Sequence, residues 1–381
     1  MPGYTLADGQ TVKNKIGATT WQALERESAK FTADRIMQLE LGLGPKGNFD
    51  ADHLKALHQY IFQDVFEFAG HTRDERFRMS DGSIATEITL RKPNGQGFLL
   101  GPHIGPALDD VAAKLQGANF FQGLPRAVFA ERAADVMLDL NGIHPFREGN
   151  GRTQRAFLRE LAKKAGHSLD FSVISRERMT RASIGGHENG DPAMMRRMFD
   201  EISAHARVDN LRRGIAALER LKVKWDDQYV ATTAPGHSVK LVLAGVAGDQ
   251  FMAQSGDNAI LFGRTAELPR PRPNVEDSFI LPGFADDNPG HERAQRFLST
   301  DQEHAAQHPD LAPAFGRLAL VTAAAKEAGL SAADQATVIE AGRQGIAADL
   351  RAGRGLDPVA IKDVGTIANE AGPGKPKLPR W

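Results

Sequence analysis

The stretch from His144 to Arg155 brings together residue types that could bind and move a phosphate-linked group. Gly149 and Gly151 can adopt backbone conformations that are closed to other residues, and Asn150 between them tolerates left-handed geometry. A turn of this kind that leads into a helix points several backbone N–H groups at one spot. The spacing therefore predicts an anion-binding nest suited to a polyphosphate.

Four charged or titratable side chains around this turn could supply the rest of the chemistry. Arg152 and Arg155 are three residues apart, so on a helix they share a face and reach towards the same anion. A single carboxylate beside phosphates, such as that of Glu148, is the usual protein ligand of Mg²⁺. His144 could act as a base, because histidine changes charge near neutral pH. Together these residues predict nucleotidyl or phosphoryl transfer to an incoming hydroxyl group.

Each of these residues also has an ordinary structural explanation when it is taken alone. A histidine before a proline is commonly a loop or core residue, and a Gly-Asn-Gly turn commonly caps a helix. Paired arginines commonly form a solvated helix face, and a loop glutamate commonly faces solvent. Because all of them occur together within one short stretch, the chemical interpretation is favoured.

Two helices are expected to hold this stretch in place. Apolar residues recur at helical spacing from about Leu124 to Asn141, and a second helical pattern runs from near Gly151 to Gly166. The candidate residues would then lie on a loop between two helices. The apolar face of the first helix is expected to contain Phe129, Ala133, Val136, Met137 and Leu140.

The chain before these helices is also expected to be mainly helical, with one exception. Asp50 and Asp52 stand where the N-cap of a helix is expected. The stretch from Thr72 to His103 is less helical and carries turn signals at Asp81-Gly82 and Asn94-Gly95. We interpret it as a hairpin or flap laid over a helical body.

The flap segment is long for a simple hairpin and rich in charge, which leaves two interpretations open. It could be a solvated loop, or an insertion that recognises an acidic surface on a protein target. A flap would align the backbone of a target protein by pairing with it as a β-strand. Its charged residues include Arg73, Asp74, Glu75, Arg76, Arg78, Arg91 and Lys92.

The loop residues resemble the signature of the Fic-domain family. From His144 to Arg155 the chain reads HPF, two further residues, GNGR, and a second arginine three positions on. The segment from Phe66 to Arg73 is similar to the one that enters the Fic flap, and the similarity continues to about His205. The resemblance implies an all-α core with a β-hairpin flap. It also implies transfer of AMP from ATP to a Ser, Thr or Tyr hydroxyl of a target protein.

The resemblance further implies a role for each residue of the loop. Phe146 matches the family's buried anchor, which packs the loop in place. The matched residues are His144 as general base, Glu148 as ligand of Mg²⁺ across the α- and β-phosphates, Gly149, Asn150 and Gly151 as phosphate cradle, and Arg152 and Arg155 as partners of the β- and γ-phosphates.

Two other transfer reactions and one non-catalytic role remain open at this point. In the related Doc branch a lysine replaces the residue matched by Gly151, and the resemblance there implies phosphate transfer. A glycine leaves room for a third phosphate, which favours adenylylation. Nothing in the motif excludes transfer of another phosphate-linked group, such as phosphocholine. An inactive scaffold in a conjugation-associated binding protein would be expected to carry substitutions in the signature, whereas His144, Glu148 and Arg152 are intact.

Many Fic proteins carry an inhibitory helix with the pattern Ser/Thr-x-x-x-Glu followed by Gly or Asn. Ser83 to Glu87, Ser299 to Glu303 and Thr366 to Glu370 have this spacing, but the next residues are Ile, His and Ala. This absence favours inhibition by a separate, small antitoxin-like partner. Small GTPases and topoisomerase subunits are both target classes of relatives, and the sequence does not rank them.

The expected organisation has five parts: a Fic domain at 1–205 with a flap at about 73–103, a linker helix at 206–224, a small antiparallel β module at 225–285, a helical region at 286–371, and a disordered basic tail at 372–381. The β module resembles the OB-like unit that follows Fic in type IV-secreted effectors. Because aromatic and basic residues are not interleaved there, nucleic-acid binding is not expected, and Phe251 and Phe262 are expected to be core residues.

Composition excludes several classes of protein. The 381 residues are 41% hydrophobic and 25% charged, with a formal net charge of -1, as in an ordinary soluble protein. The chain has no cysteine and no apolar stretch long enough to cross a membrane. Because Met1 to Lys15 lacks the core of a signal peptide, we expect a cytoplasmic product. The basic tail is similar to type IV secretion signals, so translocation into a recipient or host cell stays open.

Overall fold

The computed structural model describes residues 3–91, 97–233, 238–281, 297–298, 300 and 311–351. These form two compact units, one from Met1–Thr232 and Leu243–Thr265, the other from Thr233–Val242 and Ala266–Trp381, as far as those ranges are described. The expected turn at Asn94-Gly95, residue Lys92, most of the segment Ser299 to Glu303, the segment Thr366 to Glu370 and the tail 372–381 lie outside the described residues.

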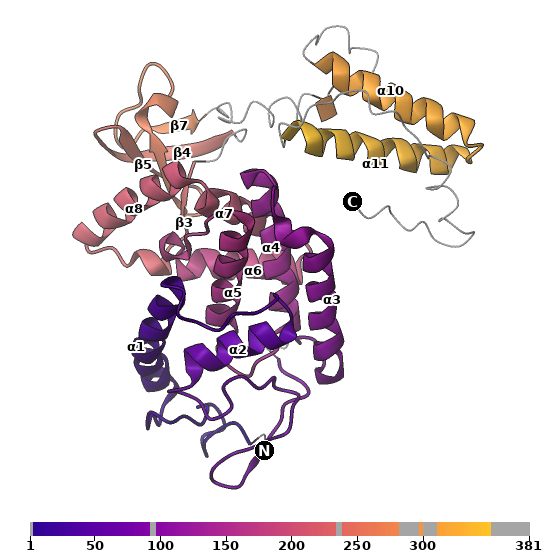
Figure 1. The fold of residues 1–381 in the computed structure, drawn as a ribbon. Helices are drawn as coiled ribbons and strands as arrows, with labels where there is room; N and C mark the ends of the chain where they lie inside the picture. The colour runs from indigo at the N-terminus through magenta and orange to yellow at the C-terminus, as the bar shows by residue number, and fades with distance from the viewer. Residues whose placement is uncertain are drawn as a thin grey trace. The chain divides into compact units, whose positions relative to one another are not determined.

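The helices of the first unit are α1 (Trp21–Glu40), α2 (Ala51–Phe62), α3 (Ile104–Gly117), α4 (Arg126–Ile143), α5 (Asn150–Ala165), α6 (Arg176–Glu188), α7 (Ala193–Ser203) and α8 (His205–Arg220). Its strands are β1 (Phe77–Arg78), β2 (Ile84–Ala85), β3 (Val230–Thr232), β5 (Gln250–Ser255) and β6 (Ile260–Arg264), and β4 (Val239–Ala247) begins in the second unit and ends in the first. The second unit also holds β7 (Ser278–Leu281), α10 (Ala312–Glu327) and α11 (Ala332–Arg351), and Figure 1 shows this last helical pair side by side.

Helix α4 is the centre of the mainly helical first unit and packs against α3, α5, α6 and α7. The two helices expected around the candidate loop are both present, each within two residues of its expected start. The Asp50 side chain caps α2 by accepting a hydrogen bond from the backbone N–H of His53 (2.8 Å), which confirms the expected N-cap. The face of α4 expected to be apolar is buried throughout, at Phe129, Ala133, Val136, Met137 and Leu140.

The expected flap segment folds as two successive hairpins. Strands β1 and β2 pair antiparallel, and the turn between them contains Gly82 with φ +81°. A second hairpin follows, in which Phe98 N–H donates to Leu90 O (3.0 Å) and Arg91 forms an antiparallel bridge with Gly97. The two segments joined here, 87–91 and 97–101, form the flap stem, and the second segment leads into α3.

Residues before α1 pack against the first of these hairpins. The Tyr4 ring meets the Phe68 ring edge-on at 4.9 Å. Lys13 Nζ donates to Asp81 Oδ2 (2.7 Å) and to Ser83 Oγ (2.8 Å). Gly3 lies so close to β2 that an added Cβ would stand 2.2 Å from Ile84 O. The start of the chain is therefore a structural part of the flap region.

The small β module expected at 225–285 contains a five-stranded sheet. The strand order is β3-β6-β5-β4-β7, with β5–β6 and β4–β7 antiparallel. Phe251 and Phe262 are buried, as expected for core residues. Strand β3, by contrast, runs parallel to β6. Two helices hold β3 in this position. Glu201 of α7 accepts hydrogen bonds from Thr232, and Arg178 of α6 donates to Val230 O (3.3 Å).

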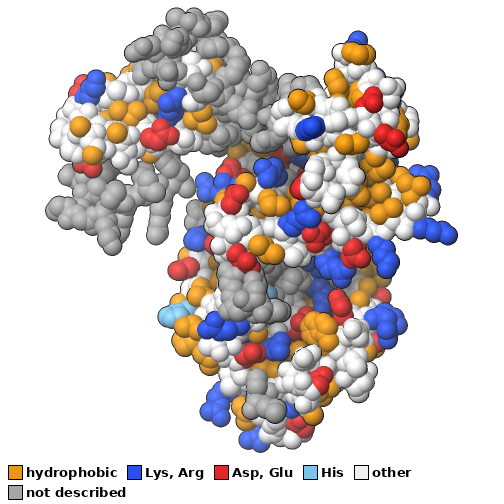
Figure 2. All heavy atoms as spheres, turned by 180° about the vertical axis from the view of Figure 1, so that it is seen from behind, with side chains coloured by type: hydrophobic (Ala, Val, Ile, Leu, Met, Phe, Trp, Pro, Cys, Tyr) orange, Lys and Arg blue, Asp and Glu red, His pale blue; other side chains and the backbone are white. Residues whose placement is uncertain are grey.

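Charge is mixed over the surface. In Figure 2 the basic and acidic side chains are interspersed across the face shown, in keeping with the net charge of -1. Every helix in the described part of the chain is too short or too polar to traverse a lipid bilayer.

The Arg178–Glu201 ion pair is buried, so its loss should be costly. Burial alone would raise the pKa of Glu201, but Arg178, Arg207 and the Thr232 hydrogen bonds outweigh it and lower the pKa below 4.5. Glu201→Ala leaves Arg178 buried without this partner, and we expect the free energy of unfolding in urea to fall by about 3–5 kcal/mol.

As a control, Glu177→Ala removes the partly exposed i,i+4 pair with Arg181 and should change the free energy of unfolding by about 0.5 kcal/mol or less. Because the folded-state pKa of Glu201 is lowered, its contribution is present above pH 4.5 and is lost as pH falls below that value. Equal stability of the two variants at neutral pH would contradict the expectation.

Candidate active site

The loop between α4 and α5 reverses the chain with two residues in the left-handed conformation. His144 follows α4 directly, with φ 48° and ψ 60°, and its N–H donates to Leu140 O (3.0 Å). Gly149 precedes α5 with φ 89°. A Cβ at Gly149 would also stand 2.4 Å from Cε2 of Phe62. Both the backbone and the packing therefore require glycine at position 149.

Gly151 differs from the expectation, because it lies within the first turn of α5 and does not have a positive φ. Only Gly149 uses the conformational freedom that the sequence suggested for both glycines. An added Cβ at Gly151 would stand 3.4 Å from Nη1 of Arg155, so position 151 borders this guanidinium. The first helical N–H groups, which have no acceptor within a helix, lie at the same end of α5.

Asn150 and Phe146 fix the shape of the loop. The Asn150 side chain is buried, and its Oδ1 accepts from Phe146 N–H (2.9 Å) while its Nδ2 donates to Phe146 O (2.7 Å). The Phe146 ring is 1% exposed and stacks on the His58 ring, with centroids 3.9 Å apart and planes inclined by 9°. Asn150 thus holds the loop through its side chain.

His58 of α2 links the loop to the start of the flap segment. Its Nδ1 accepts from the backbone N–H of Gly70 (2.8 Å), so its Nε2 must carry the proton that bonds Glu148 O (2.9 Å). Burial lowers the pKa of His58 from 6.5 to about 3. The ring is therefore neutral at physiological pH and holds one fixed tautomer.

Arg152 points from α5 towards α1. Its Nη1 donates to Ser28 Oγ (3.3 Å) and Thr32 Oγ1 (3.2 Å), and its guanidinium lies 4.6 Å from the centre of the Phe62 ring. Nη2 stands 3.5 Å from Glu148 Oε1, a distance that leaves the carboxylate oxygens accessible to another cation. Burial lowers the pKa of Arg152.

Arg155 completes a concentration of positive charge at the start of α5. Burial, and then the neighbouring cations Arg159 and Arg152, lower its pKa from 12.5 to about 10. Within the described ranges, no carboxylate forms an ion pair with its guanidinium. A cation held in such surroundings is stabilised by an anion, so these two arginines suit a polyphosphate.

His144 and Glu148 stand at either end of the loop. The His144 ring is only partly buried and stacks on the Phe98 ring from the flap, with centroids 3.8 Å apart. The Glu148 side chain is partly exposed beside Arg152. Its carboxylate at the mouth of an anion nest fits the single protein ligand that Mg²⁺ takes beside phosphates.

Three residues that hold this site were not identified from the sequence: His58, Ser28 and Thr32. A signal for His58 was present, because it lies on the apolar face of α2 between Leu57 and Ile61. A polar residue on a buried face needs partners. Ser28 and Thr32 are one turn apart on α1 and gave no comparable signal, since small hydroxyl residues are common on helices.

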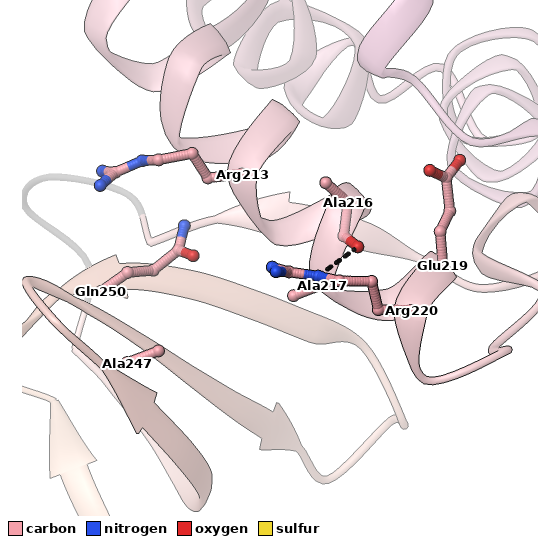
Figure 3. Close-up of a pocket in the computed structure, with 7 residues that line it drawn as sticks. All are labelled: Arg213, Ala216, Ala217, Glu219, Arg220, Ala247 and Gln250. Carbon is pink, nitrogen blue, oxygen red and sulfur yellow. Dashed lines mark hydrogen bonds between the residues drawn. The ribbon is translucent and has the colours of Figure 1, made fainter.

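A separate groove of about 760 Å³ lies between α8 and strands β4 and β5 (Figure 3). Arg213 beside it is paired with Asp249 (2.7 Å), and Arg220 Nε donates to Ala216 O (3.2 Å). None of its lining residues belongs to the loop between α4 and α5. The groove is therefore distinct from the candidate active site.

We expect His58 to keep its neutral, Nε2-protonated form from pH 8 down to pH 5, where an ordinary histidine would have become charged. Long-range ¹H–¹⁵N spectra of the imidazole report this directly, with His58→Asn identifying the signals. Because the folded-state pKa is depressed, folding stability decreases as pH falls from 6.5 towards 3. A titration midpoint for His58 between pH 5 and 8 would contradict the hydrogen-bond arrangement.

Comparison with known proteins places these residues in a family. Residues 48–162 match the Fic/DOC family. The chain is 33% identical over 267 residues to a protein adenylyltransferase of Bartonella henselae, which covers 70% of this chain and 49% of that protein. It is 30% identical over 196 residues to a probable protein adenylyltransferase Fic of Salmonella typhimurium, covering 51% of this chain and 89% of that protein.

Solved structures agree with these relatives. The type IV secretion system effector protein BepA matches with a TM-score of 0.68 and 30% identity, over 74% of this chain and 96% of that one. An N-terminal Fic domain from Bartonella quintana with bound ADP matches with a TM-score of 0.51 and 38% identity, over 54% of this chain and 97% of that one. The chain also matches protein adenylyltransferase VbhT of Bartonella schoenbuchensis at 35% identity over 54% of this chain. It spans less than half the length of either Bartonella adenylyltransferase, 49% and 41%. Its match to nearly all of the Salmonella relative nevertheless shows the family, and the chain belongs to the Fic/DOC family.

Proposed function

We propose that this protein transfers AMP from ATP to a hydroxyl side chain of another protein. The observation that carries the proposal is the arrangement of one loop, which puts His144 and the cations Arg152 and Arg155 at opposite ends of a sharp turn. The relatives named protein adenylyltransferase support the same reaction. A Fic domain with bound ADP supports a nucleotide as the ligand of this fold.

In the proposed reaction the target hydroxyl oxygen attacks the α-phosphorus of ATP. A bond forms between these two atoms, the bond from the α-phosphorus to the bridging oxygen of the β-phosphate breaks, and pyrophosphate leaves. His144 takes the hydroxyl proton as general base. Backbone N–H groups of Gly149, Asn150 and Gly151 would cradle the phosphates, and Arg152 and Arg155 would bind the β- and γ-phosphates.

Glu148 would hold Mg²⁺ at the mouth of the nest. When bound, the ion neutralises charge on the α- and β-phosphates. Glu148 is suited to the role because its backbone is fixed by His58 while its side chain remains partly exposed. Arg152 lies near enough to orient the carboxylate without bonding it closely.

The space at Gly151 favours a nucleotide that points its β- and γ-phosphates into the nest. A lysine there, as in the Doc branch, would place its side chain in front of Arg155, since even a Cβ would stand 3.4 Å from Nη1. Three phosphates would then compete with this side chain for the same volume. We therefore propose AMP transfer rather than phosphate transfer.

His144→Ala should lower AMP transfer by about 10²–10⁴-fold, the usual contribution of general acid–base catalysis. The assay is mass spectrometry of the protein itself and of candidate targets after incubation with ATP and Mg²⁺. His205→Ala, an exposed histidine at the start of α8, is the matched control and should retain activity. GTP, UTP and CDP-choline in parallel reactions test the alternative groups. Modification by CDP-choline alone, or equal activity of wild type and His144→Ala, would overturn the proposal.

The proposed reaction also indicates which protein target and which inhibitor to look for. The target is a protein with an accessible hydroxyl, and small GTPases and topoisomerase subunits are the classes to test. A separate antitoxin-like inhibitor is favoured, because Ser83 to Glu87 is not helical and Glu87 pairs with Arg147 (2.7 Å). The likeness to a type IV secretion effector supports action in a recipient or host cell, and a toxin role in the producing cell is the alternative to test.

Expression without an inhibitor should slow the growth of a bacterial host, and expression of His144→Ala should not. The reason is that the proposed inhibitor is a separate chain, so nothing restrains the catalytic loop. Growth curves at protein levels matched by immunoblot make the comparison. Identical growth of the two strains would count against a toxin that needs inhibition in trans.

A further inference from the structure

Arg73 is fully buried, although it begins a segment of charged residues that was expected to be a solvated or target-facing surface. That expectation was wrong for Arg73. Its Nε donates to His144 O (2.9 Å), and its Nη1 donates to Glu87 O (3.0 Å) and Ile88 O (3.1 Å). One guanidinium thus joins the backbone of the catalytic loop to the stem of the flap.

The second terminal nitrogen of Arg73 extends the same link. Nη2 donates to Leu99 O, on the returning side of the flap, and lies 3.5 Å from Ile143 O at the end of α4. The Arg73 backbone adds two more bonds, since its N–H donates to Pro145 O (2.8 Å) and its carbonyl accepts from Glu87 N–H (2.6 Å). Both the main chain and the side chain of this residue bridge the two segments.

Among the described residues, every hydrogen bond of the Arg73 side chain ends on a backbone carbonyl. Because a planar guanidinium offers five N–H groups in a fixed fork, it can orient several carbonyls at once, which a lysine cannot do. Buried carbonyls left without a donor are unfavourable. Loss of the side chain would therefore release three chain segments together.

Two weaker links run beside Arg73. Leu99 N–H donates to Gly142 O (3.2 Å), and Arg147 of the loop forms a partly exposed ion pair with Glu87 (2.7 Å). Neither of them reaches the His144 backbone. The Phe98 ring of the flap stacks on the His144 imidazole, whereas Arg73 binds the His144 backbone carbonyl.

We propose that Arg73 is a positioning residue that holds the flap stem and the backbone of His144 in one geometry. A target strand that pairs with the flap is then already aligned with the His144 imidazole, so its hydroxyl lies beside the base. The inference rests on the proposed function, because it assigns the coupling of flap and base to that reaction. Arg73 would touch neither nucleotide nor target.

The test compares Arg73→Met, Arg73→Lys and, as a matched control, Arg132→Met, which changes an exposed arginine on α4. We expect Arg73→Met to lower kcat for AMP transfer by about 100-fold, the effect of a small misplacement of reacting groups. ATP affinity by calorimetry should change less than about threefold, because the nest is intact. Arg73→Lys should restore part of kcat, and Arg132→Met should behave as wild type.

Hydrogen exchange supplies a readout that does not depend on catalysis. In Arg73→Met the flap-stem amides of Glu87, Leu99 and Gly101 should exchange at least about tenfold faster, with α4 and α5 unchanged. Exchange that rises equally in the helices, or transfer within about threefold of wild type, would overturn the inference. If Arg73→Met does not fold, Arg73→Lys decides, since normal transfer with a loosened stem refutes the coupling. Absence of AMP transfer by the wild type would instead refute the proposed function, and the exchange experiment would still test the positioning role.

Discussion

The burial of Phe146 is the constraint on which the catalytic loop depends. A loop of six residues between α4 and α5 cannot form a core of its own, so its shape must come from one anchored side chain. The ring is held on one face by His58, and its backbone is held on both sides by the Asn150 amide. With the middle of the loop fixed, the left-handed turns at His144 and Gly149 set the directions of the His144 imidazole and of the helix N-terminus.

The electrostatics of the site are organised around the same short helix. Two cations lie in its first turns, where the helix dipole also favours negative charge. Arg152 is supported by hydroxyl groups of Ser28 and Thr32, which direct the guanidinium without cancelling its charge. Arg155 is kept near Arg152 although each cation disfavours the other. Two neighbouring cations repel each other, and a bound polyphosphate would offset this repulsion.

Much of the fold could be predicted from the sequence, because it follows from local pattern. Apolar periodicity gave α4 and α5 to within two residues, and the β module was expected at 225–285. The Fic signature located the candidate loop, while the roles of its residues remain proposals. Strand β3 and its parallel pairing could not be predicted, since a three-residue strand is specified by its partners, here Glu201 and Arg178.

Charge and glycine content were the less reliable guides. Arg73 stands among charged residues that are mostly exposed, and only the carbonyls gathered from distant segments explain its burial. Such long-range partners leave no mark in a local pattern. Gly149 and Gly151 look equivalent in the sequence, yet only Gly149 has a positive φ, whereas Gly151 lies within α5 beside Arg155. His58 could have been found, since a histidine on an apolar helix face requires buried partners.

The packing of the residues before α1 bears on how this protein is handled at the bench. Gly3 rests on β2, Tyr4 on Phe68, and Lys13 on the turn at Asp81. A shortened chain that begins at α1 would uncover the Phe68 ring and remove one wall of the flap-bearing segment. Affinity tags and trimming at that end therefore act on the region proposed to meet a target, and a tag-free chain is the appropriate reference for measurements of specificity.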